Sequence, residues 1–301
     1  MKHFLTLREL PRNQIETILE TAIRLKRDVK RGNRESFFQN RVLGLLFEKP
    51  SLRTRVSFET LFAQHGGSSI YLSNDVGWPN REPICDFIPI LTSYVDLLVI
   101  RSKSHAVVEE AVRYAQCPII NGLTDVSHPC QALADILTVM ELTDDLGKTK
   151  ITYVGDANNV AYSLAVICDK LGIELVIAAP EGYQFDDSFL NQMTSGCVSQ
   201  TSDAIAAMTD ANFVYTDVWT SMGQEEETAA RLKAFANYQV NQGLMKHAAD
   251  NCKLLHCLPA RRGEEVSAEV IDGPQSAIIQ QAENRLHAQK GLVHWMFEQN
   301  R

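Results

Sequence analysis

Apolar runs alternate with helical patterns along this chain, and the alternation restricts its fold more than any other feature. In the first half we predict four strands, at 42–47, 69–72, 95–100 and 117–121. Each is followed by a segment with helical periodicity, at 53–65, 84–94, 105–115 and 129–142. A further helix over 12–28 precedes the first strand. Because successive parallel strands need a crossover connection, which is usually a helix, strict alternation predicts a parallel sheet.

The second half repeats this pattern after a polar, charged stretch at 143–150. The predicted strands are 151–155, 174–179, 212–216 and 253–257, and the predicted helices are 159–172, 202–210, 227–238 and 281–299. The last helix has one face formed by Leu286, Gln289, Val293 and Met296, although Gly291 weakens it. We therefore predict an α/β fold with two parallel-sheet domains and a boundary in 143–150.

The size and charge of the chain argue against several classes of function. With 301 residues and 45% hydrophobic content, the chain is long enough for two domains with a large core. Its 37 acidic residues outnumber its 29 lysines and arginines, which gives a net charge of −8. A chain with a net negative charge is repelled by nucleic acid and by anionic membranes, so we expect neither as the main partner.

The cysteines and the N-terminus indicate a compartment. The seven cysteines contain no CxxC pair and stand mostly in apolar segments, which favours reduced thiols and suggests no metal site. The first apolar run ends at Arg8 and Glu9, too soon for a signal peptide, and no window is long enough to span a membrane. We therefore expect a cytoplasmic protein.

Groups that bind anions gather after the first predicted strand. Ser51 stands where the strand ends and a helix begins, so its oxygen and the neighbouring backbone N–H groups face the space above the helix start. With the helix dipole and the guanidinium of Arg53, this arrangement is typical of a phosphate pocket. The alternative is a capped helix whose arginines are solvated or paired with Glu48 and Glu59. This segment alone does not decide between them.

Two later strand ends of the same half carry further polar side chains. Arg101 directly follows the strand at 95–100, at the carboxyl edge where ligands bind in open α/β sheets. His128 precedes Pro129, a suitable first helical residue, and Gln131 follows within the first turn. A single histidine at a helix start is more often a cap or a surface residue. Three such groups at successive strand ends predict one common binding crevice.

In the second half, the turn at 155–161 lies between a strand and a helix, as in a dinucleotide site. It lacks the second and third glycines of that fingerprint, which argues against a nicotinamide enzyme. Asn158 and Asn159 offer amide hydrogen bonds suited to a carboxylate or an amino group, and capping of the turn is the alternative.

Two more strand ends in this half carry charged or reactive groups. Asp217 is followed by a loop that ends in Gly223, and its carboxylate either caps the backbone or binds an ammonium group. Cys257 and Leu258 follow another strand. As a nucleophile Cys257 would need a basic partner, and a buried structural thiol is the commoner case.

Four short motifs together resemble a known family. They are FEKPSLRTR, HPCQ, DVWTSMG and HCLPARRGEE, which begin at residues 47, 128, 217 and 256. In this order, and over essentially the whole chain, they are similar to the motifs of the ornithine carbamoyltransferases, in the aspartate/ornithine carbamoyltransferase family. The resemblance implies transfer of the carbamoyl group of carbamoyl phosphate to the side-chain amine of L-ornithine. The products would be L-citrulline and phosphate, in arginine biosynthesis, and no cofactor or metal would be needed.

The same resemblance implies a domain layout and an assembly. A carbamoyl phosphate-binding domain would cover 1–142, with a C-terminal helix at 284–301 that crosses back to it. An ornithine-binding domain would cover 150–283. The assembly would be a homotrimer, or a multiple of one, with sites at subunit interfaces.

The resemblance also assigns roles to matching positions. It implies a carbamoyl phosphate site formed by Ser51, Leu52, Arg53, Thr54, Arg101, His128, Gln131 and Arg285. It implies an ornithine site formed by Asn159, Asp217, Ser221, Met222, Cys257 and Leu258. The catalytic residues would be Arg101, His128 and Cys257.

Two positions depart from the family pattern. Leu52 stands where the family usually has threonine, which removes a hydroxyl but leaves the backbone N–H. The segment 74–83, expected to reach a neighbouring subunit, lacks the usual glutamine and is spaced differently. Trp78, Asn80 and Arg81 are its candidates for that contact.

Rival functions stay open on the sequence alone. The acceptor could be another amine, such as putrescine or an N-acylated ornithine. Residues 221–223, with Asn159 and Asp217, favour a free amino acid, because a diamine has no carboxylate. The intact arginine, histidine and glutamine positions of the first half argue against a catalytically silent, ligand-binding homologue. The missing glycines argue against a Rossmann-type oxidoreductase.

Overall fold

The chain divides into two compact units. The computed structural model describes residues 1–221 and 224–300, and for residues 74 and 225 it describes the backbone only. Unit 1 comprises Met1–Leu137 and Glu283–Arg301, and unit 2 comprises Thr138–Ala282. The division falls inside helix α5 (Pro129–Leu142), just before the predicted boundary at 143–150.

Unit 1 is built on a four-stranded sheet. Its strands, in the order β2-β1-β3-β4, are β1 (Val42–Phe47), β2 (Ser68–Leu72), β3 (Leu97–Arg101) and β4 (Ile119–Leu123). All the pairings are parallel, as the alternation of strands and helices predicts. Its helices are α1 (Arg12–Lys30), α2 (Leu52–Gln64), α3 (Ile84–Tyr94), α4 (His105–Tyr114), part of α5 and most of α12 (Ile278–Gln299), with a 3-10 turn η1 (Asn74–Val76).

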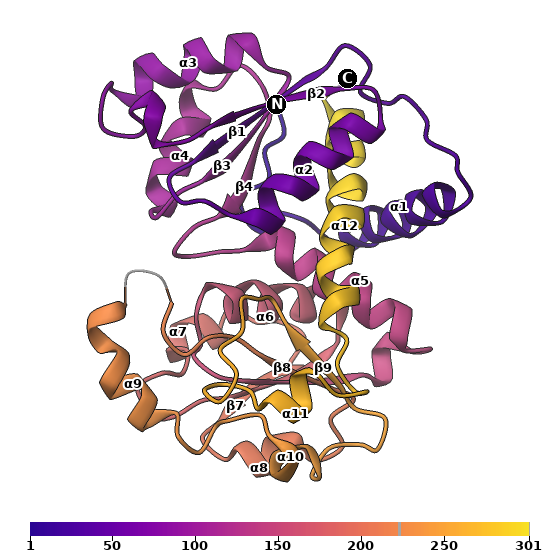
Figure 1. Ribbon diagram of the computed structural model, residues 1–301, viewed down its shortest axis with the longest axis vertical. Helices are drawn as coiled ribbons and strands as arrows, with labels where there is room; N and C mark the ends of the chain where they lie inside the picture. The colour runs from indigo at the N-terminus through magenta and orange to yellow at the C-terminus, as the bar shows by residue number, and fades with distance from the viewer. Residues whose placement is uncertain (222–223, 301) are drawn as a thin grey trace. The chain divides into compact units, whose positions relative to one another are not determined.

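Helices cover both faces of this sheet (Figure 1). Helices α3 and α4 lie on one face, where Ile88 and Val108 pack with Leu98 in a buried core. Helix α2 lies on the other face, and its Phe58 and Phe62 are fully buried. A strand that is covered on both faces has no polar side to alternate with its apolar one. This explains why β1 and β3 read as continuous apolar runs.

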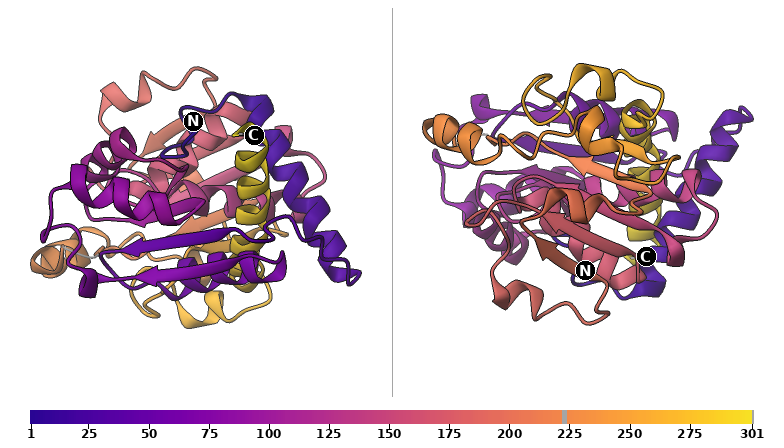
Figure 2. Two further views of the ribbon diagram at one scale, coloured as in Figure 1. Left: turned by 90° about the horizontal axis from the view of Figure 1, so that it is seen from above. Right: turned by 90° about the horizontal axis from the view of Figure 1, so that it is seen from below.

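Helix α12 packs closely against α1 (Figure 2). A Cβ at Gly291 would lie 2.3 Å from the carbonyl oxygen of Ile18 and 2.9 Å from the Cβ of Ala22, so only glycine fits there. The glycine that weakens α12 by sequence criteria therefore lets the two helices approach. The predicted apolar face is only part of the buried surface, because every residue from 287 to 293 is buried.

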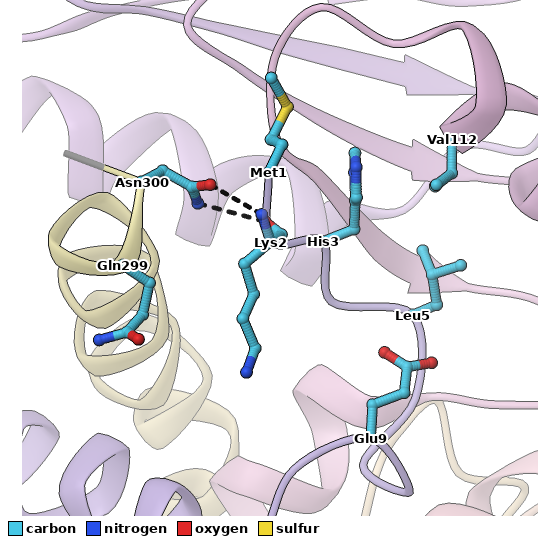
Figure 3. A pocket seen from close by; sticks show the side chains of 8 residues that line it. All are labelled: Met1, Lys2, His3, Leu5, Glu9, Val112, Gln299 and Asn300. Carbon is cyan, nitrogen blue, oxygen red and sulfur yellow. Dashed lines mark hydrogen bonds between the residues drawn. The ribbon is translucent and has the colours of Figure 1, made fainter.

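The N-terminal segment lies along the outer edge of β4. The backbone N–H of Phe4 donates to the carbonyl of Ile119, and the N–H of Asn121 donates to the carbonyl of Phe4, both at 2.8 Å. The side chain of Asn300 hydrogen-bonds both the N–H and the carbonyl of Lys2 (Figure 3). A pocket of about 580 Å³ lies beside these residues, and none of its lining residues belongs to the predicted substrate sites.

Unit 2 contains a second parallel sheet. Its strands, in the order β7-β6-β5-β8-β9, are β5 (Lys150–Val154), β6 (Glu174–Ala178), β7 (Val198–Thr201), β8 (Phe213–Thr216) and β9 (Lys253–His256). The pairings are again parallel, as predicted. Strand β7 was not predicted, because its sequence VSQT has a single apolar residue and it lies at the sheet edge.

The helices of unit 2 are mostly short. They are α6 (Asn159–Leu171), α7 (Asp187–Leu190), α8 (Ala204–Met208), α9 (Thr228–Ala234), α10 (Gln242–Met245) and α11 (Ala268–Ile271), with 3-10 turns η2 (Leu146–Lys148) and η3 (Glu225–Glu227). Helices α8 and α9 are shorter than the sequence predicts, and α7, α10 and α11 are too short to show a periodicity. Within the described ranges, no helix is both long and apolar enough to cross a membrane.

Candidate active site

Ser51 caps helix α2 directly after strand β1. Its Oγ accepts a hydrogen bond from the N–H of Thr54 at 3.4 Å and lies 3.1 Å from the Thr54 hydroxyl oxygen. The first N–H groups of a helix have no intrahelical acceptor, so they and the helix dipole attract an anion. Leu52 supplies one of these N–H groups, while its side chain is 75% exposed. The predicted cap is confirmed.

The structural alternative for this segment, an arginine paired with a nearby glutamate, is found at Arg55. Arg55 pairs with Glu59 at 3.0 Å on an exposed surface of α2. Glu48 has other partners, because its carboxylate accepts hydrogen bonds from the Ser102 hydroxyl and the Lys103 N–H. It therefore fixes the turn after β3.

A buried chain of hydrogen bonds joins helices α2, α5 and α12. Nη1 of Arg285 donates to Oε1 of Gln131 at 2.7 Å, and Nη2 lies 3.3 Å from the Thr54 hydroxyl oxygen. Nε2 of Gln131 donates in turn to Oδ1 of Asp135 at 2.8 Å. An uncharged amide and an uncharged hydroxyl thus help to position the Arg285 guanidinium.

Positive charge converges on His128, which is buried at the start of α5. Burial lowers the pKa of His128 well below its usual value, and the charges of Arg285, Arg101 and Arg53 lower it further. The imidazole is therefore neutral at pH 7. Arg101, at the end of β3, is only 7% exposed. Several cations around a neutral imidazole donor suit a ligand with more than one negative charge.

Unit 1 thus brings the residues assigned to carbamoyl phosphate into one region at the carboxyl ends of its strands. Hydrogen bonds link Ser51 to Thr54, and Thr54 through Arg285 to Gln131. The remaining cations act on the same imidazole. This arrangement can bind a phosphate and donate hydrogen bonds to an adjoining carbonyl oxygen.

In unit 2, Asp217 follows β8 and is 7% exposed. Its Oδ1 accepts hydrogen bonds from the N–H of Val218 at 2.8 Å and from the thiol of Cys257 at 3.0 Å. Its Oδ2 accepts one from Nδ2 of Asn158 at 3.0 Å. All three donors are neutral, so none of them brings a positive charge to this carboxyl group, and a cationic group of a ligand would suit it.

Asn158 both caps helix α6 and holds Asp217. Its Oδ1 accepts hydrogen bonds from the N–H groups of Val160 and Ala161, at 2.9 and 3.1 Å. This fixes the amide so that Nδ2 faces Asp217. Asn159, which the resemblance assigns to ornithine, is the half-buried first residue of the same helix. The sequence indicates both asparagines as candidate ligands, but no local pattern in it predicts that Asn158 contacts Asp217.

A buried pair of side chains shapes the loop that carries Cys257. Nε2 of His256 lies 3.0 Å from Oε1 of Glu265, and both side chains are fully buried. Nδ1 of His256 accepts a hydrogen bond from the N–H of Leu258 at 2.8 Å, where the backbone φ is 59°. The Cys257 thiol donates to the carboxylate of Asp217, and a protonated thiol is a weak nucleophile, so the loop favours contact with a substrate over covalent attack.

Three potential metal ligands meet at this loop. One atom each from Asp217, His256 and Cys257 lie within 4.8 Å of one another. Both ring nitrogens of His256 already take part in hydrogen bonds, and the other two side chains bond each other. A metal would have to displace one of these contacts, so the geometry fits a substrate contact better than a resident metal.

Arg231 ties the loop after Asp217 to strand β5. Its Nη1 donates to Oδ2 of Asp156 at 2.7 Å and to the carbonyl of Trp219 at 3.0 Å, and its Nε donates to Glu227 at 2.8 Å. The sequence does not predict this buried arginine, because Asp156 and Trp219 are brought to it only by the fold.

Two predicted residues lie in this loop. The N–H of Ser221 donates to the side chain of Gln224 at 3.0 Å. Met222, with Gly223, lies outside the described residues. The ornithine residues that the structure does describe are therefore Asn159, Asp217, Ser221, Cys257 and Leu258.

The segment 74–83 contains one residue that serves its own unit. Trp78 is 4% exposed and its ring centroid lies 5.2 Å from that of Phe87, in the core beside α3. Asn80 and Arg81 are exposed. Of the three candidates for contact with a neighbouring subunit, only these two have accessible side chains.

Family models match both halves of the chain. The model for the aspartate/ornithine carbamoyltransferase carbamoyl-P binding domain matches residues 2–141. The model for the Asp/Orn binding domain of the same family matches residues 147–296.

Individual relatives match over nearly the full length. The ornithine carbamoyltransferase of Bacillus subtilis is 46% identical over 299 residues, covering 97% of this chain and 92% of the relative. The solved ornithine carbamoyltransferase of Pyrococcus furiosus is 44% identical with a TM-score of 0.94, covering 98% of this chain and 96% of that one. The solved anabolic enzyme of Campylobacter jejuni is 34% identical with a TM-score of 0.93, covering 99% and 100%.

Proposed function

Because this chain belongs to the aspartate/ornithine carbamoyltransferase family, we propose that it transfers the carbamoyl group of carbamoyl phosphate to the side-chain amine of L-ornithine. The products are L-citrulline and phosphate. The convergence of Arg53, Arg101 and Arg285 on a neutral His128 carries this proposal, because it suits a phosphate that bears a carbonyl. The anabolic relative supports a role in arginine biosynthesis.

Unit 1 binds carbamoyl phosphate in this proposal. The phosphate lies at the start of α2, held by Ser51, Thr54, the Leu52 N–H and the guanidiniums of Arg53 and Arg285. Arg101, His128 and Gln131 hold the carbamoyl end. These side chains come from the start of α2, the end of β3, the start of α5 and from α12, and the hydrogen bonds between them support a preorganised site.

The transfer step is an attack by a neutral amine on the carbamoyl carbon. The new C–N bond places negative charge on the carbonyl oxygen, and Arg101, His128 and the Thr54 hydroxyl donate hydrogen bonds to it. The C–O bond to phosphate then breaks, and the departing phosphate takes the amine proton. A neutral imidazole suits this role because it donates a hydrogen bond without itself giving up a proton.

Unit 2 binds ornithine in this proposal. Asp217 pairs with the α-ammonium, Asn159 and the loop at Ser221 and Met222 hold the α-carboxylate and amino group, and Cys257 and Leu258 lie beside the side-chain amine.

The charges around this site favour ornithine over aspartate. Arg261 pairs with Glu264, Arg262 forms two hydrogen bonds with Asp272, and Arg231 is bound to acidic partners. Three nearby arginines therefore have partners already, while Asp217 presents a negative charge. The carboxylate of Asp217 would repel a second carboxylate on the acceptor, whereas it would not repel an amine.

We assign the two substrates to domains 1–142 with 284–301 and 150–283, with the cytoplasm as the compartment. The names of the two family models support the domains, and seven cysteines without disulfides support a reducing compartment.

A homotrimer is the proposed assembly. Strand β2 lies at the sheet edge and bears Ile70, 46% exposed, and α2 bears Leu52 and Val56, 75% and 47% exposed. Apolar side chains on an edge strand and its neighbouring helix are a surface that a second copy would cover. Light scattering should give three chains per particle, and an active monomer would contradict this assembly.

The decisive experiment compares acceptors. With carbamoyl phosphate present, kcat/KM is measured for ornithine, N-acetylornithine, putrescine and aspartate by the carbamoylated product. We expect ornithine to exceed the others by roughly 10⁴-fold, the scale on which a site rejects a substrate that leaves its polar groups unpaired. Equal use of putrescine, or no transfer to ornithine, would contradict the proposal.

A further inference from the structure

Asp135 is a buried acid that the proposed mechanism does not use. It lies on α5 one turn after Gln131 and is 0% exposed. Its Oδ1 accepts the 2.8 Å hydrogen bond from Nε2 of Gln131. A buried ionisable group costs folding free energy unless its contacts compensate, so its presence here points to a role in the arrangement of its neighbours.

Asp135 determines which way the Gln131 amide faces. An amide has one acceptor end and one donor end, and an ionised carboxylate only accepts. The –NH₂ of Gln131 must therefore face Asp135, which leaves Oε1 to accept from Arg285 at 2.7 Å. With the amide reversed, –NH₂ would face the guanidinium, and both hydrogen bonds would be lost.

We call the hydrogen-bonded series Asp135, Gln131 and Arg285 the relay. The relay also has an electrostatic effect. The carboxylate of Asp135 polarises the amide of Gln131, so that Oε1 becomes a stronger acceptor for Arg285. Loss of this carboxylate should therefore loosen the hold on the guanidinium.

We propose that Asp135 is a positioning residue for the phosphate site, which orients Arg285 through the amide of Gln131. This inference rests on the proposed function of unit 1 and extends it to a residue that contacts no substrate.

The test is Asp135→Asn, which keeps the size of the side chain and removes its charge. Two quantities are measured: the KM for carbamoyl phosphate and the inhibition constant of inorganic phosphate. Both should rise about tenfold, the difference between a hydrogen bond to a charged group and a neutral one. The KM for ornithine should stay as in the parent. Unchanged phosphate affinity would overturn the proposal.

A double-mutant cycle separates positioning from a general loss of structure. In an Arg285→Ala background, Asp135→Asn should not lower the affinity for phosphate any further, because the group that Asp135 positions is already absent. Additive losses would overturn the proposal. If Asp135→Asn does not fold, Asp135→Glu keeps the charge and should keep the phosphate affinity of the parent, and its loss would count against the relay.

The matched control is Asp169→Asn in unit 2. Asp169 is also a buried helical carboxylate, but it accepts hydrogen bonds from the N–H groups of Thr194 and Ser195 at 2.9 and 2.8 Å. The Asp169→Asn variant should have a lower unfolding temperature and the same affinity for phosphate as the parent. A parent enzyme that makes no citrulline would contradict the proposed function instead. The role of Asp135 is then tested without turnover, by calorimetric titration of the parent and of Asp135→Asn with inorganic phosphate, where equal affinity would overturn it.

Discussion

Replacing Asp217 by asparagine should lower kcat/KM for ornithine and leave the KM for carbamoyl phosphate unchanged. Asp217 is 7% exposed and accepts from Val218, Cys257 and Asn158 at 2.8 to 3.0 Å. An asparagine that keeps the first two contacts turns its –NH₂ toward the –NH₂ of Asn158. The substitution thus removes the charge opposite the α-ammonium and adds a donor facing a donor. Losing one partner of a desolvated charge pair costs about 2 to 5 kcal/mol, or roughly 30-fold to several thousand-fold in kcat/KM.

The assay is steady-state kinetics with each substrate varied in turn. The control is Asp203→Asn, an N-cap of α8 in the same unit whose side chain accepts from the Ala206 N–H. Asparagine caps a helix as well as aspartate does, so this variant should match the parent for both substrates. Unchanged ornithine dependence in Asp217→Asn, or an equal loss for carbamoyl phosphate, would refute the assignment of Asp217 to the acceptor.

Three further predictions concern charge, packing and pH. Arg53→Ala should abolish turnover with an unchanged circular dichroism spectrum, whereas Arg12→Ala, which breaks only an exposed pair with Glu16, should keep full activity in the same assay. Gly291→Ala should destabilise the protein by about 1 to 3 kcal/mol, seen as a lower unfolding temperature, because its Cβ would meet α1; an unchanged temperature would contradict this packing. Burial lowers the pKa of His287 from 6.5 to about 4, so the unfolded chain binds more protons than the folded one between these values. Stability should therefore fall by about 3 kcal/mol as the pH drops through this range, and urea unfolding of His287→Asn should show a smaller dependence.

The sequence predicts the sheets because their central strands are buried on both faces. Strands such as β1 and β3 have no polar side, so they stand out as apolar runs between helical patterns. Strand β7 at a sheet edge keeps polar residues and gives no such signal. Four-residue helices such as α7 and α10 are shorter than two turns, so their periodicity cannot be detected.

The residues of the candidate site also divide into those that the sequence locates and those that it does not. Ser51, Arg101 and Asp217 could be located because each stands at the end of a predicted strand, where parallel sheets bind ligands. Asp135 and Arg231 could not, because the groups that give them a role, Arg285 for the Gln131–Asp135 pair and Asp156 for Arg231, come from distant segments and no local pattern identifies them. The sequence supplies the groups that would face the substrates, and the tertiary structure identifies the residues that hold them.

Carbamoyl transfer to ornithine can be observed by following both products of one reaction. Carbamoyl phosphate labelled with carbon-13 in its carbamoyl group is mixed with ornithine and the enzyme, and carbon and phosphorus NMR spectra are recorded together. We expect the label to appear in the ureido carbon of citrulline at the same rate as free phosphate is released. Phosphate released without labelled citrulline, at a rate independent of ornithine, would contradict it.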